Sequence, residues 1–373
     1  MNNVLVLGGT GAMGSFLVEI LAQKGYNVYV TTRSNRKSFD NIYYCQGNAH
    51  DINFVKYILS DKYWFAIIDF MQYTTNEFQN RYQLFLKSTL QYIFVSSARV
   101  YADSIEPINE MSPRLLDISN DNNFLYTDDY ALAKARQEDL LLKNDLKNWT
   151  IIRPYMTYFD NRLDLGYFSK ELWLFRVVNN KSILFLDDVA SKLTTLTYGS
   201  DVANSIYCLL GEKNAFGEIF NIMQCKTCKW SEVLNVYKKC LEDYGCTLKV
   251  KMIDEYPIAY EYIYKYDRVF NRVFDSSKIS MYIDINGFVD PINGLANCMS
   301  EFLNKPSFLS IDWKKQAFWD QILGERTSLS EIGNKKKWLV YLLFRYALPY
   351  SLVCMVWHYY KILINRFFKR VDI

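Results

Sequence analysis

Apolar runs and amphipathic segments alternate along the first half of the chain. Apolar runs of strand length occupy 3–8, 26–34, 64–71 and 91–101, and a further one ends within 41–51. Between them, apolar residues recur at helical spacing over 15–25, from about Asn76 to Leu86, and over 130–143. Strands and helices that alternate in this way predict an α/β fold with a Rossmann-like, doubly wound parallel sheet. Ligands of such sheets bind outside the carboxyl ends of the strands, where Ser96, Ser97 and Tyr101 fall.

The residues after Pro154 are expected to form a second, smaller lobe. They hold a helical pattern at 170–180, a strand that leads into another helix over 192–210, and a strand at 217–223. We therefore predict a dinucleotide-binding domain at 1–155, a substrate lobe interleaved with returns to the sheet at 156–304, and a helical extension at 305–373. Four aromatic residues could stack on a base or a sugar, although packing in the core is the preferred interpretation for each: Tyr158, Trp173, Phe185 and Trp230.

Composition narrows the function classes. With 22% charged residues and a net charge of +3, the chain lacks the polyelectrolyte character that would favour nucleic acid. The N-terminal run leads directly into glycines and lacks the features of a signal peptide.

The eight cysteines are expected to be free thiols in a reducing cytoplasm. A lone C-x-x-C at 225–228 has poor spacing for zinc toward Cys240 and Cys246, so no metal site is expected.

The first strand enters a glycine-rich turn. Gly8, Gly11 and Gly14 stand in G-x-x-G-x-x-G spacing between a strand and a helix. Glycine is needed here because the backbone must turn tightly, approach a pyrophosphate without a Cβ and pack close to the sheet. The first amides of the helix and its dipole then face the phosphates. Dinucleotide binding is favoured over a turn without a ligand, and Thr10, Ala12 and Met13 of the same turn are assigned to the cofactor site.

The end of the second strand indicates which dinucleotide is bound. An Asp or Glu there would hydrogen-bond the ribose 2′-hydroxyl of NAD and repel a phosphate. The chain instead reads TTRSNRK at 31–37, without an acid until Asp40. A 2′-phosphate could be held there through charge-assisted hydrogen bonds by Thr32, Arg33, Ser34 and Arg36. NADP is therefore preferred and NAD is the alternative; a solvated basic loop is the other interpretation of this stretch.

One predicted helix carries the strongest candidate chemistry. Tyr130 and Lys134 are spaced i, i+4 and so share a helix face. With 30 tyrosines in the chain and lysine at roughly a tenth of residues or less, roughly one or two Tyr-x-x-x-Lys pairs are expected by chance alone. The pair gains meaning from its context, because an ammonium can lower a phenol's pKa toward neutrality, as an acid or base for a carbinol oxygen requires. Ser97, at the end of the preceding strand, can hold the same oxygen by a hydrogen bond.

Together these motifs resemble the extended short-chain dehydrogenase/reductase superfamily, in its branch of nucleotide-sugar epimerases, dehydratases and reductases. The matching segments are GGTGAMG, VSSARVYA, YALAK, WTIIRPYMTY and LTYGSDVANSI, which span roughly residues 1–225. The resemblance implies Ser97, Tyr130 and Lys134 as catalytic residues, with Ser96 the less favoured serine. It places Pro154, Tyr155 and Met156 along the nicotinamide and Phe70 and Met71 on the inner ribose side. The remaining cofactor contacts that we assign are Asn48, Ala49, Ser96, Tyr130 and Lys134. Arg153 and Asp201 are expected to be structural.

Departures from the family pattern bear on the reaction. Ala98-Arg99 stands where dehydratases of this branch carry an Asp-Glu pair, which argues against sugar dehydration. The segment 113–129 lengthens the separation of Ser97 from Tyr130, and the asparagine expected on the preceding helix is open between two candidates, Asn76 and Asn80. The two histidines, His50 and His358, lie outside the matched substrate region, so a second acid/base for ring epimerisation is not expected.

These features predict an NADP(H)-dependent oxidoreductase that acts on a nucleotide-activated sugar by reducing a ketosugar. Arg33 and the missing acid favour a reductase, since a reductase must exchange its cofactor. A nucleotide-sugar epimerase with tightly held NAD(P) is the close alternative, because epimerisation by hydride removal and return needs only Tyr130. A non-catalytic NADP-binding regulator or scaffold is the second alternative. A homodimer in the cytoplasm is expected, with a role in polysaccharide biosynthesis.

The C-terminal segment 335–373 is both apolar and basic. Its uncharged run, Tyr346 to Tyr360, has 15 residues and is interrupted by Pro349, whereas about 20 residues are needed to span a bilayer. Eight Lys and Arg residues against Asp372 alone give the segment a charge of +7. An apolar segment rich in Trp and Tyr with basic flanks is typical of an interfacial anchor on anionic lipid. Peripheral contact with the inner face of the cytoplasmic membrane is one expectation, and a helical pair docked on the protein or on a dimer partner is the other.

Overall fold

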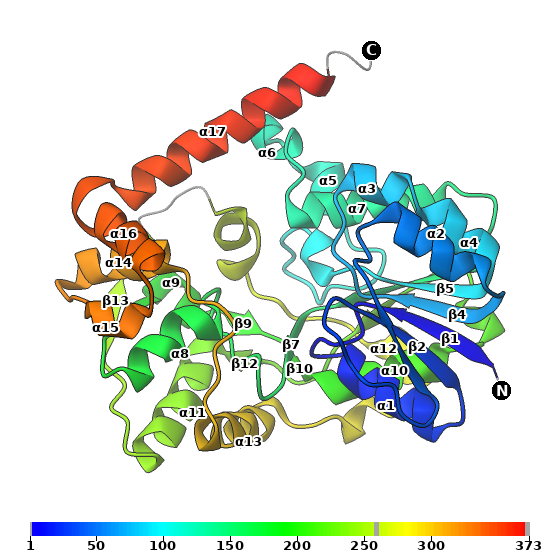
Figure 1. Ribbon diagram of the computed structural model, residues 1–373, viewed down its shortest axis with the longest axis horizontal. Helices are drawn as coiled ribbons and strands as arrows, with labels where there is room; N and C mark the ends of the chain where they lie inside the picture. Colours follow the sequence, from blue (N-terminus) through cyan, green and yellow to red (C-terminus); the bar gives the residue numbers. More distant parts are fainter. Residues whose placement is uncertain (1, 257–260, 370–373) are drawn as a thin grey trace.

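The computed structural model of the protein describes residues 2–256 and 261–369, and within the last helix it does not describe the side chains of 361, 362 and 364–369. Figure 1 shows two lobes, one built on a sheet with helices on both faces and one that is mainly helical. The sheet lobe holds the first half of the chain together with segments that return to it later.

The larger lobe is built on a seven-stranded sheet in the order β11-β6-β5-β4-β1-β2-β3. Its strands are β1 (Asn3–Leu7), β2 (Asn27–Thr32), β3 (Ile42–Gln46), β4 (Trp64–Asp69), β5 (Thr89–Val95), β6 (Trp149–Pro154) and β11 (Glu218–Ile222). All neighbouring pairs are parallel. The strand order reverses at β1, between β2 and β4, which is the point where doubly wound sheets bind ligands. The predicted fold class is confirmed.

Helices cover both faces of this sheet, because its strands carry apolar side chains on both sides. In β1, Val4 and Val6 enter one core cluster and Leu5 and Leu7 enter another. The first cluster is closed by α1 (Gly14–Gln23) and α10 (Gly199–Leu209). The second is closed by α2 (Ile52–Ser60), α4 (Tyr82–Ser88) and α7 (Tyr130–Leu142). Burial on two sides explains why these strands read as continuous apolar runs.

The helix expected over 76–86 is in fact two helices, α3 (Thr75–Gln79) and α4. Arg81 lies at the break and is buried, with 3% of its surface exposed. Its guanidinium donates hydrogen bonds to three backbone carbonyls, those of Glu77 at 2.8 Å, Ala49 at 3.0 Å and His50 at 3.1 Å. A buried guanidinium requires such acceptors, and the helix breaks where Arg81 turns inward to reach them.

The smaller lobe is built around a further core cluster of short strands and longer helices, which also takes in Ala98, Val100 and Ala135 of the sheet lobe. Its elements are β7 (Met156–Tyr158), α8 (Lys170–Val178), β8 (Ile183–Leu186), α9 (Asp187–Ala190), β9 (Leu193–Thr194), β10 (Leu196–Tyr198), β12 (Cys228–Lys229), α11 (Trp230–Asp243), β13 (Val250–Ile253), α13 (Pro291–Asn304), α14 (Trp313–Leu323) and α15 (Leu329–Ile332). The four aromatic residues considered for stacking are at most 2% exposed and belong to this core. Packing, the preferred interpretation, is therefore the one that the structure supports.

Short helical pieces connect these elements. They are η1 (Ala98–Val100), α5 (Leu115–Ile118), α6 (Asn122–Leu125), η2 (Lys213–Ala215), the π-helical η3 (Tyr264–Arg268), α12 (Ser277–Ser280) and η4 (Ile285–Gly287). The lengthened segment 113–129 forms α5 and α6 on the rim of the sheet lobe (Figure 1). Phe124 of α6 packs against Tyr262 and Tyr266, with ring centroids 4.7 and 4.2 Å apart. This contact joins the rim of the sheet lobe to the segment that carries η3.

The chain ends in α16 (Lys335–Leu342), the π-helical η5 (Leu343–Ala347) and α17 (Tyr350–Lys369). In Figure 1, α16 lies on the smaller lobe and α17 extends from it in the direction of α6. Among the described residues, no single helix is long and apolar enough to cross a bilayer. Lys335–Ala347 and Tyr350–Tyr360 meet that criterion only as a pair, and they are bent by 99° at their junction.

Candidate active site

A cavity of about 390 Å³ lies at the carboxyl ends of β4, β5 and β6, beside the start of α7. Nine of the residues predicted for catalysis or cofactor binding line it together: Met13, Phe70, Ser96, Ser97, Tyr130, Lys134, Pro154, Tyr155 and Met156. Residues of the smaller lobe close the cavity from the other side, including Arg162, Tyr167 and Arg268. The cavity is therefore shared by both lobes.

Tyr130 and Lys134 are presented to the cavity by the first turns of α7. Asp129 begins the helix, and its carboxylate accepts a hydrogen bond from the Ala131 amide at 3.0 Å. Asp129 therefore caps the amino terminus of α7. Because Tyr130 is the first helical residue, its side chain stands at the rim of the sheet, while Lys134 lies one turn deeper with 2% of its surface exposed.

The ammonium of Lys134 is fixed between two strand ends. It donates hydrogen bonds to the carbonyls of Val95 at 2.8 Å and Met71 at 3.1 Å. Burial lowers the pKa of Lys134 to about 8, although the carboxylates of Asp69 and Glu138 act in the opposite direction. Lys134 thus remains mainly protonated at neutral pH in a place where water cannot solvate its charge.

The two neighbouring serines have different surroundings. The Ser96 hydroxyl donates to the buried carboxylate of Glu138 at 2.5 Å. The same carboxylate pairs with Arg153 at 2.7 Å and with Arg114 at 3.3 Å, which fits the structural role expected of Arg153. The Ser97 oxygen accepts a bond from the Arg99 amide at 3.2 Å and has no part in this carboxylate cluster. Of the two hydroxyls, that of Ser97 is the one available to a substrate oxygen.

Asp69 is a buried acid at this site that the sequence analysis did not single out. Its carboxylate accepts hydrogen bonds from the Tyr92 hydroxyl at 2.8 Å and the Met71 amide at 2.9 Å. Burial raises its pKa, while its hydrogen bonds and the nearby Lys134 oppose that shift. Asp69 therefore shapes the Phe70-Met71 turn and places a carboxyl near the ammonium. A single acid that ends an apolar strand, as in WFAIID, was the signal for it.

The glycine-rich turn has the geometry that a dinucleotide requires. Gly8 has a φ of +72°, which L side chains rarely adopt, and a Cβ on Gly14 would lie 2.7 Å from the backbone of Gly9. A Cβ on Gly11 would meet nothing within 4 Å, so the surface above that residue is open. No side chain caps the first amides of α1, and its first turn holds no acid. An anion can therefore approach these amides directly, and the residues fit a bound pyrophosphate.

The other predicted cofactor residues lie in this turn or at and after the ends of β2, β3 and β4, and they do not line the cavity. They are Gly8, Thr10, Gly11, Ala12, Gly14, Thr32, Arg33, Ser34, Arg36, Asn48, Ala49 and Met71. Arg33 and Arg36 are exposed in the loop after β2, and the Arg36 guanidinium lies 5.7 Å from the ring centroid of Tyr44. The Thr32 hydroxyl bonds within the same loop, to the amide and carbonyl of Ser34. These assignments stay predictions.

Three arginines in the cavity wall were not predicted as site residues. Arg99 stacks on the Tyr130 ring at 5.0 Å from its centroid and lies 3.8 Å from Asp129. Arg268 donates to the Tyr155 hydroxyl at 2.9 Å and pairs with Asp267, while Arg162 is 3.6 Å from Asp164. With Lys134, four cations line the cavity against Asp164 as its acid. Arg268 lies far along the chain, and no local motif marks it.

Several other expectations can be compared with the structure. Asn76 and Asn80 are both exposed and neither lines the cavity. His50 is 3.0 Å from Glu77, and His358 is 3.4 Å from the Tyr262 hydroxyl, so both lie away from the cavity lining. Asp201 accepts a bond from the Val289 amide at 2.9 Å, which supports its structural role. Among the described residues, no group of three or more His, Cys, Asp or Glu side chains is placed to hold a metal ion.

The N-terminal part of the chain matches a known family. Residues 4–75 match the model of the NAD dependent epimerase/dehydratase family. A chloroplast protein of Arabidopsis thaliana, named chloroplast stem-loop binding protein of 41 kDa b, is 27% identical over 234 residues. This match covers 59% of the present chain, and the chain spans 58% of the length of that relative.

Solved structures share about four fifths of this chain's fold at low sequence identity. An epimerase from Methanothermobacter thermautotrophicus aligns with a TM-score of 0.65 and 16% identity, over 81% of this chain and 92% of that one. A UDP-glucuronic acid 4-epimerase from Bacillus cereus, solved with NAD, aligns with a TM-score of 0.61 and 15% identity, over 81% and 97%. A dTDP-glucose 4,6-dehydratase from Bacillus anthracis, also with NAD, gives 0.61 and 16%, over 82% and 97%. The resemblance to the extended short-chain dehydrogenase/reductase fold is confirmed, and the prediction of an enzyme agrees with the family that residues 4–75 match.

Proposed function

We propose that this protein is an NADP(H)-dependent oxidoreductase that reduces a keto group on a nucleotide-activated sugar. The observation that carries the proposal is the convergence of Ser97, Tyr130 and Lys134 on one cavity, beside the glycine-rich turn that fits a dinucleotide. The three side chains come from the end of β5 and the start of α7. A proton donor and a hydrogen-bond donor for the same oxygen are what carbonyl reduction needs from a protein.

In this proposal the cofactor supplies a hydride to the carbonyl carbon, and the chain supplies the proton. The Tyr130 hydroxyl gives its proton to the carbonyl oxygen, which becomes the product hydroxyl. The Ser97 hydroxyl orients that oxygen by a hydrogen bond. Lys134 holds a positive charge on the same helix face, and its two carbonyl partners fix its position. Solvent then returns a proton to Tyr130.

The preference for NADP rests on the loop after β2. Arg33 and Arg36 are exposed there, and the strand ends without the acid that would select NAD. A guanidinium binds a phosphate through charge-assisted hydrogen bonds. Its hydrogen bond to an uncharged ribose hydroxyl is weaker. NAD is the alternative cofactor, since the solved epimerase and dehydratase named above were obtained with NAD.

The charge of the cavity supports an anionic substrate such as a nucleotide sugar, whose pyrophosphate is negative. Arg99, Arg162 and Arg268 meet in its wall. One named neighbour was solved with UDP-glucuronic acid, which is a substrate of this chemical class. Arg99 occupies the place of the dehydratase acid pair, so the cavity has a cation where dehydration would require an acid. Reduction without loss of water is therefore the reaction proposed.

An epimerase is the second candidate, favoured by the match of residues 4–75 to the epimerase/dehydratase family and by the likeness to the two epimerases named above. Epimerisation would use the same Tyr130 but keep its cofactor through a full redox cycle. Denaturing the purified protein and identifying released nucleotide by mass spectrometry separates the two. Retained NAD(P) supports the epimerase, whereas an empty protein that binds NADPH in preference to NADH supports the reductase.

The variant Tyr130→Phe tests the catalytic proposal against a non-catalytic binding role, since the plant relative is named as a binding protein. NADPH oxidation is followed with a panel of nucleotide-linked ketosugars, and NADPH binding is measured by titration. We expect turnover to be lost and binding to be kept. Tyr57→Phe, on an exposed tyrosine outside the cavity lining, is the matched control. Turnover by Tyr130→Phe at the wild-type rate would reject the mechanism.

We further propose a cytoplasmic location, a homodimeric state and a role in polysaccharide biosynthesis, where nucleotide sugars are consumed. Sedimentation velocity of the full chain tests the dimer. Peripheral contact with the membrane through 335–373 is also proposed, and the surface that would make it is argued next.

A further inference from the structure

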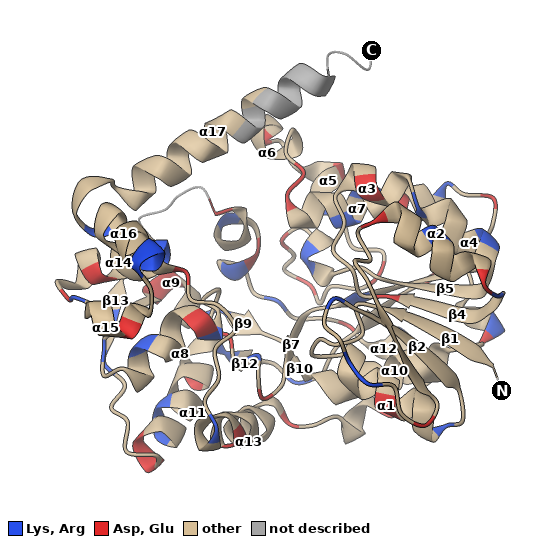
Figure 2. Cartoon of the chain, viewed as in Figure 1, with Lys and Arg blue, Asp and Glu red and all other residues tan. Residues whose placement is uncertain are grey.

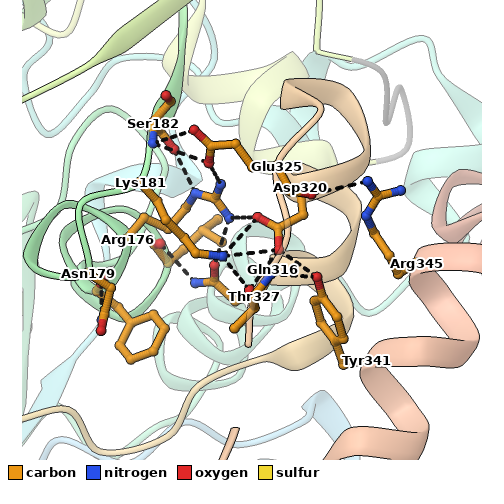
Figure 3. A network of polar contacts seen from close by, with 12 residues as sticks. Arg176, Asn179, Lys181, Ser182, Gln316, Asp320, Glu325, Thr327, Tyr341 and Arg345 are labelled. Carbon is orange, nitrogen blue, oxygen red and sulfur yellow. Dashed lines mark hydrogen bonds and ion pairs between the residues drawn. The ribbon is translucent and has the colours of Figure 1, made fainter. Parts of the chain in front are cut away.

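The C-terminal helices begin as an integral part of the smaller lobe. Figure 3 shows a buried network around Asp320 of α14. Its carboxylate is 2.8 Å from Arg176 and accepts hydrogen bonds from the hydroxyls of Thr327 and Tyr341, both at 2.7 Å. Tyr341 belongs to α16 and is fully buried. This network fixes α16 on the protein, so a deletion from residue 335 onward would also remove part of the core.

One face of α17 continues this packing. Tyr350 contacts Phe318 and Phe344, with ring centroids 5.4 and 5.8 Å apart. Cys354 packs against the same core, and His358 lies 3.4 Å from the Tyr262 hydroxyl. These three residues are spaced i, i+4, i+8, so they form a single stripe along the helix. That stripe is the inner face of α17.

The opposite face of α17 is apolar and exposed. Leu352 is 45% exposed, Val356 60%, Tyr359 51% and Leu363 64%. Their spacing of i, i+4, i+7 and i+11 makes them one stripe as well, and Tyr360 at 51% flanks it. A surface helix of a globular protein normally carries polar residues on its outer face. In α17 that face is instead leucine, valine and aromatic rings.

The preceding helical segment, α16 continued by η5, also exposes apolar residues in a row. Leu339, Leu343 and Tyr346 are 69%, 47% and 60% exposed at i, i+4 and i+7. Lys335, Lys336 and Lys337 are exposed at the start of α16, and Figure 2 shows this basic turn near the first turns of α17, which carry no Lys, Arg, Asp or Glu. The sequence places further cations at Lys361, Arg366, Lys369 and Arg370. Arg370 and Asp372, and the side chains of the other three, lie outside what the structure describes.

We infer that this outer stripe of α16 and α17 is a docking surface for an anionic lipid bilayer, lying in the plane of the interface. Both helical segments expose rows of apolar and aromatic side chains, and exposed apolar surface of this kind marks an interaction site. Trp and Tyr favour the boundary between headgroups and acyl chains. The uncharged run is bracketed by cations, which complement anionic headgroups. A second copy of the chain is the poorer occupant, because it would bring two segments of charge +7 together. The inference goes beyond the proposed reaction and does not depend on it.

Vesicle flotation of the full-length protein tests this assignment. The probes are vesicles of phosphatidylcholine alone and vesicles that also contain phosphatidylglycerol. The double variant Val356→Glu/Leu363→Glu puts two acids on the outer stripe. Its control, Tyr57→Glu/Leu309→Glu, makes the same change at residues that are 76% and 94% exposed elsewhere. Thermal unfolding and NADPH titration confirm that each variant is folded.

We expect wild type and the control to float with anionic vesicles, and the outer-stripe variant to lose at least about tenfold in bound fraction, since each buried apolar side chain contributes to partitioning. The triple variant Lys335→Gln/Lys336→Gln/Lys337→Gln should also bind anionic vesicles less, and high salt should weaken wild-type binding. Lys56→Gln/Lys238→Gln/Lys239→Gln, at exposed lysines elsewhere, is its control.

Three outcomes would overturn the inference. The first is equal binding by wild type and the outer-stripe variant. The second is equal binding to neutral and anionic vesicles, which would remove the role of the cations. The third is absence of vesicle binding together with a wild-type dimer that Val356→Glu/Leu363→Glu converts to a monomer in sedimentation velocity. That result would assign the stripe to a second copy of the chain.

Discussion

Ser96, at the end of β5, and Glu138 of α7 form a buried hydrogen bond of 2.5 Å. This bond gives Ser96 a different role from its neighbour Ser97. Ser96 is bound to a carboxylate that also carries Arg153 and Arg114. Ser97 lines the shared cavity, and its hydroxyl oxygen accepts a hydrogen bond from the Arg99 amide and none from this cluster. Of these two adjacent serines, Ser96 therefore stabilises the fold and Ser97 is the one that we propose binds the substrate.

The serine assignment predicts opposite effects for two alanine variants. Ser97→Ala should lower kcat by about 10²-fold or more, as loss of a donor to the reacting oxygen does, with little change in stability. Ser96→Ala should lower the free energy of unfolding by about 1.5–3 kcal/mol, because a charged acceptor loses its donor. Steady-state kinetics and urea unfolding of both variants check this. The reverse pattern would make Ser96 the catalytic serine.

The lowered pKa of Lys134 makes stability depend on pH in a definite direction. The native pKa is about 8, whereas the unfolded value is about 10.4. Between these values the unfolded chain binds the proton and the native chain does not, so stability rises with pH. We expect wild type to gain up to about 3 kcal/mol relative to Lys134→Met from pH 8 to 10.5. Urea unfolding at a series of pH values measures the difference in stability between wild type and Lys134→Met. A difference that does not change with pH would contradict a lowered pKa for Lys134.

The loop after β2 predicts a change in cofactor preference. Arg33→Ala should weaken NADPH binding by about 10- to 100-fold, the range for a lost bond between charged groups. NADH binding should be unchanged, because NADH has no 2′-phosphate. Lys37→Ala, an exposed cation in the same loop, is the control. Fluorescence titration with both dinucleotides decides the matter. Equal losses for NADPH and NADH would place Arg33 outside the 2′-phosphate site.

The Asp320 network predicts a large stability effect far from the cavity. Burial alone would raise the pKa of Asp320, but Arg176, Thr327 and Tyr341 hold it below its ordinary value. Asp320→Ala leaves the buried guanidinium of Arg176 with one partner fewer and should cost about 3–5 kcal/mol. Asp145→Ala, at an exposed position, should change stability little. Urea unfolding compares the two, and a cost below about 1 kcal/mol would mean that the network is not a stabilising element.

The same acid gives a second, pH-dependent readout. Because its native pKa is lowered, its stabilising contribution is complete above the unfolded value of about 3.9 and is lost as pH falls through the native value. Wild type and Asp320→Ala should therefore approach each other in stability below pH 4. A gap that stays constant in acid would indicate that packing, and not charge, accounts for the effect.

The features that could be predicted from the sequence alone are those set by residues close together in the chain. The glycine-rich turn, the individual strand and helix patterns and the Tyr130–Lys134 spacing each depend on residues within a few positions of one another, so their geometry follows from backbone conformation and helical period. The uncharged run before Tyr360 was also visible, as was its basic flank.

Packing between distant segments decided the rest. Arg81 breaks a helix to reach carbonyls on another loop, Ser96 turns to Glu138, and Arg268 enters the cavity from more than 100 residues beyond Tyr155. A helix such as α17, apolar around most of its circumference, does not indicate which side faces inward. Only the contacts of Tyr350 and Cys354 with the core fixed that choice. These arrangements depend on which surfaces meet in three dimensions. The periodicity of a single segment does not show which other segment it packs against.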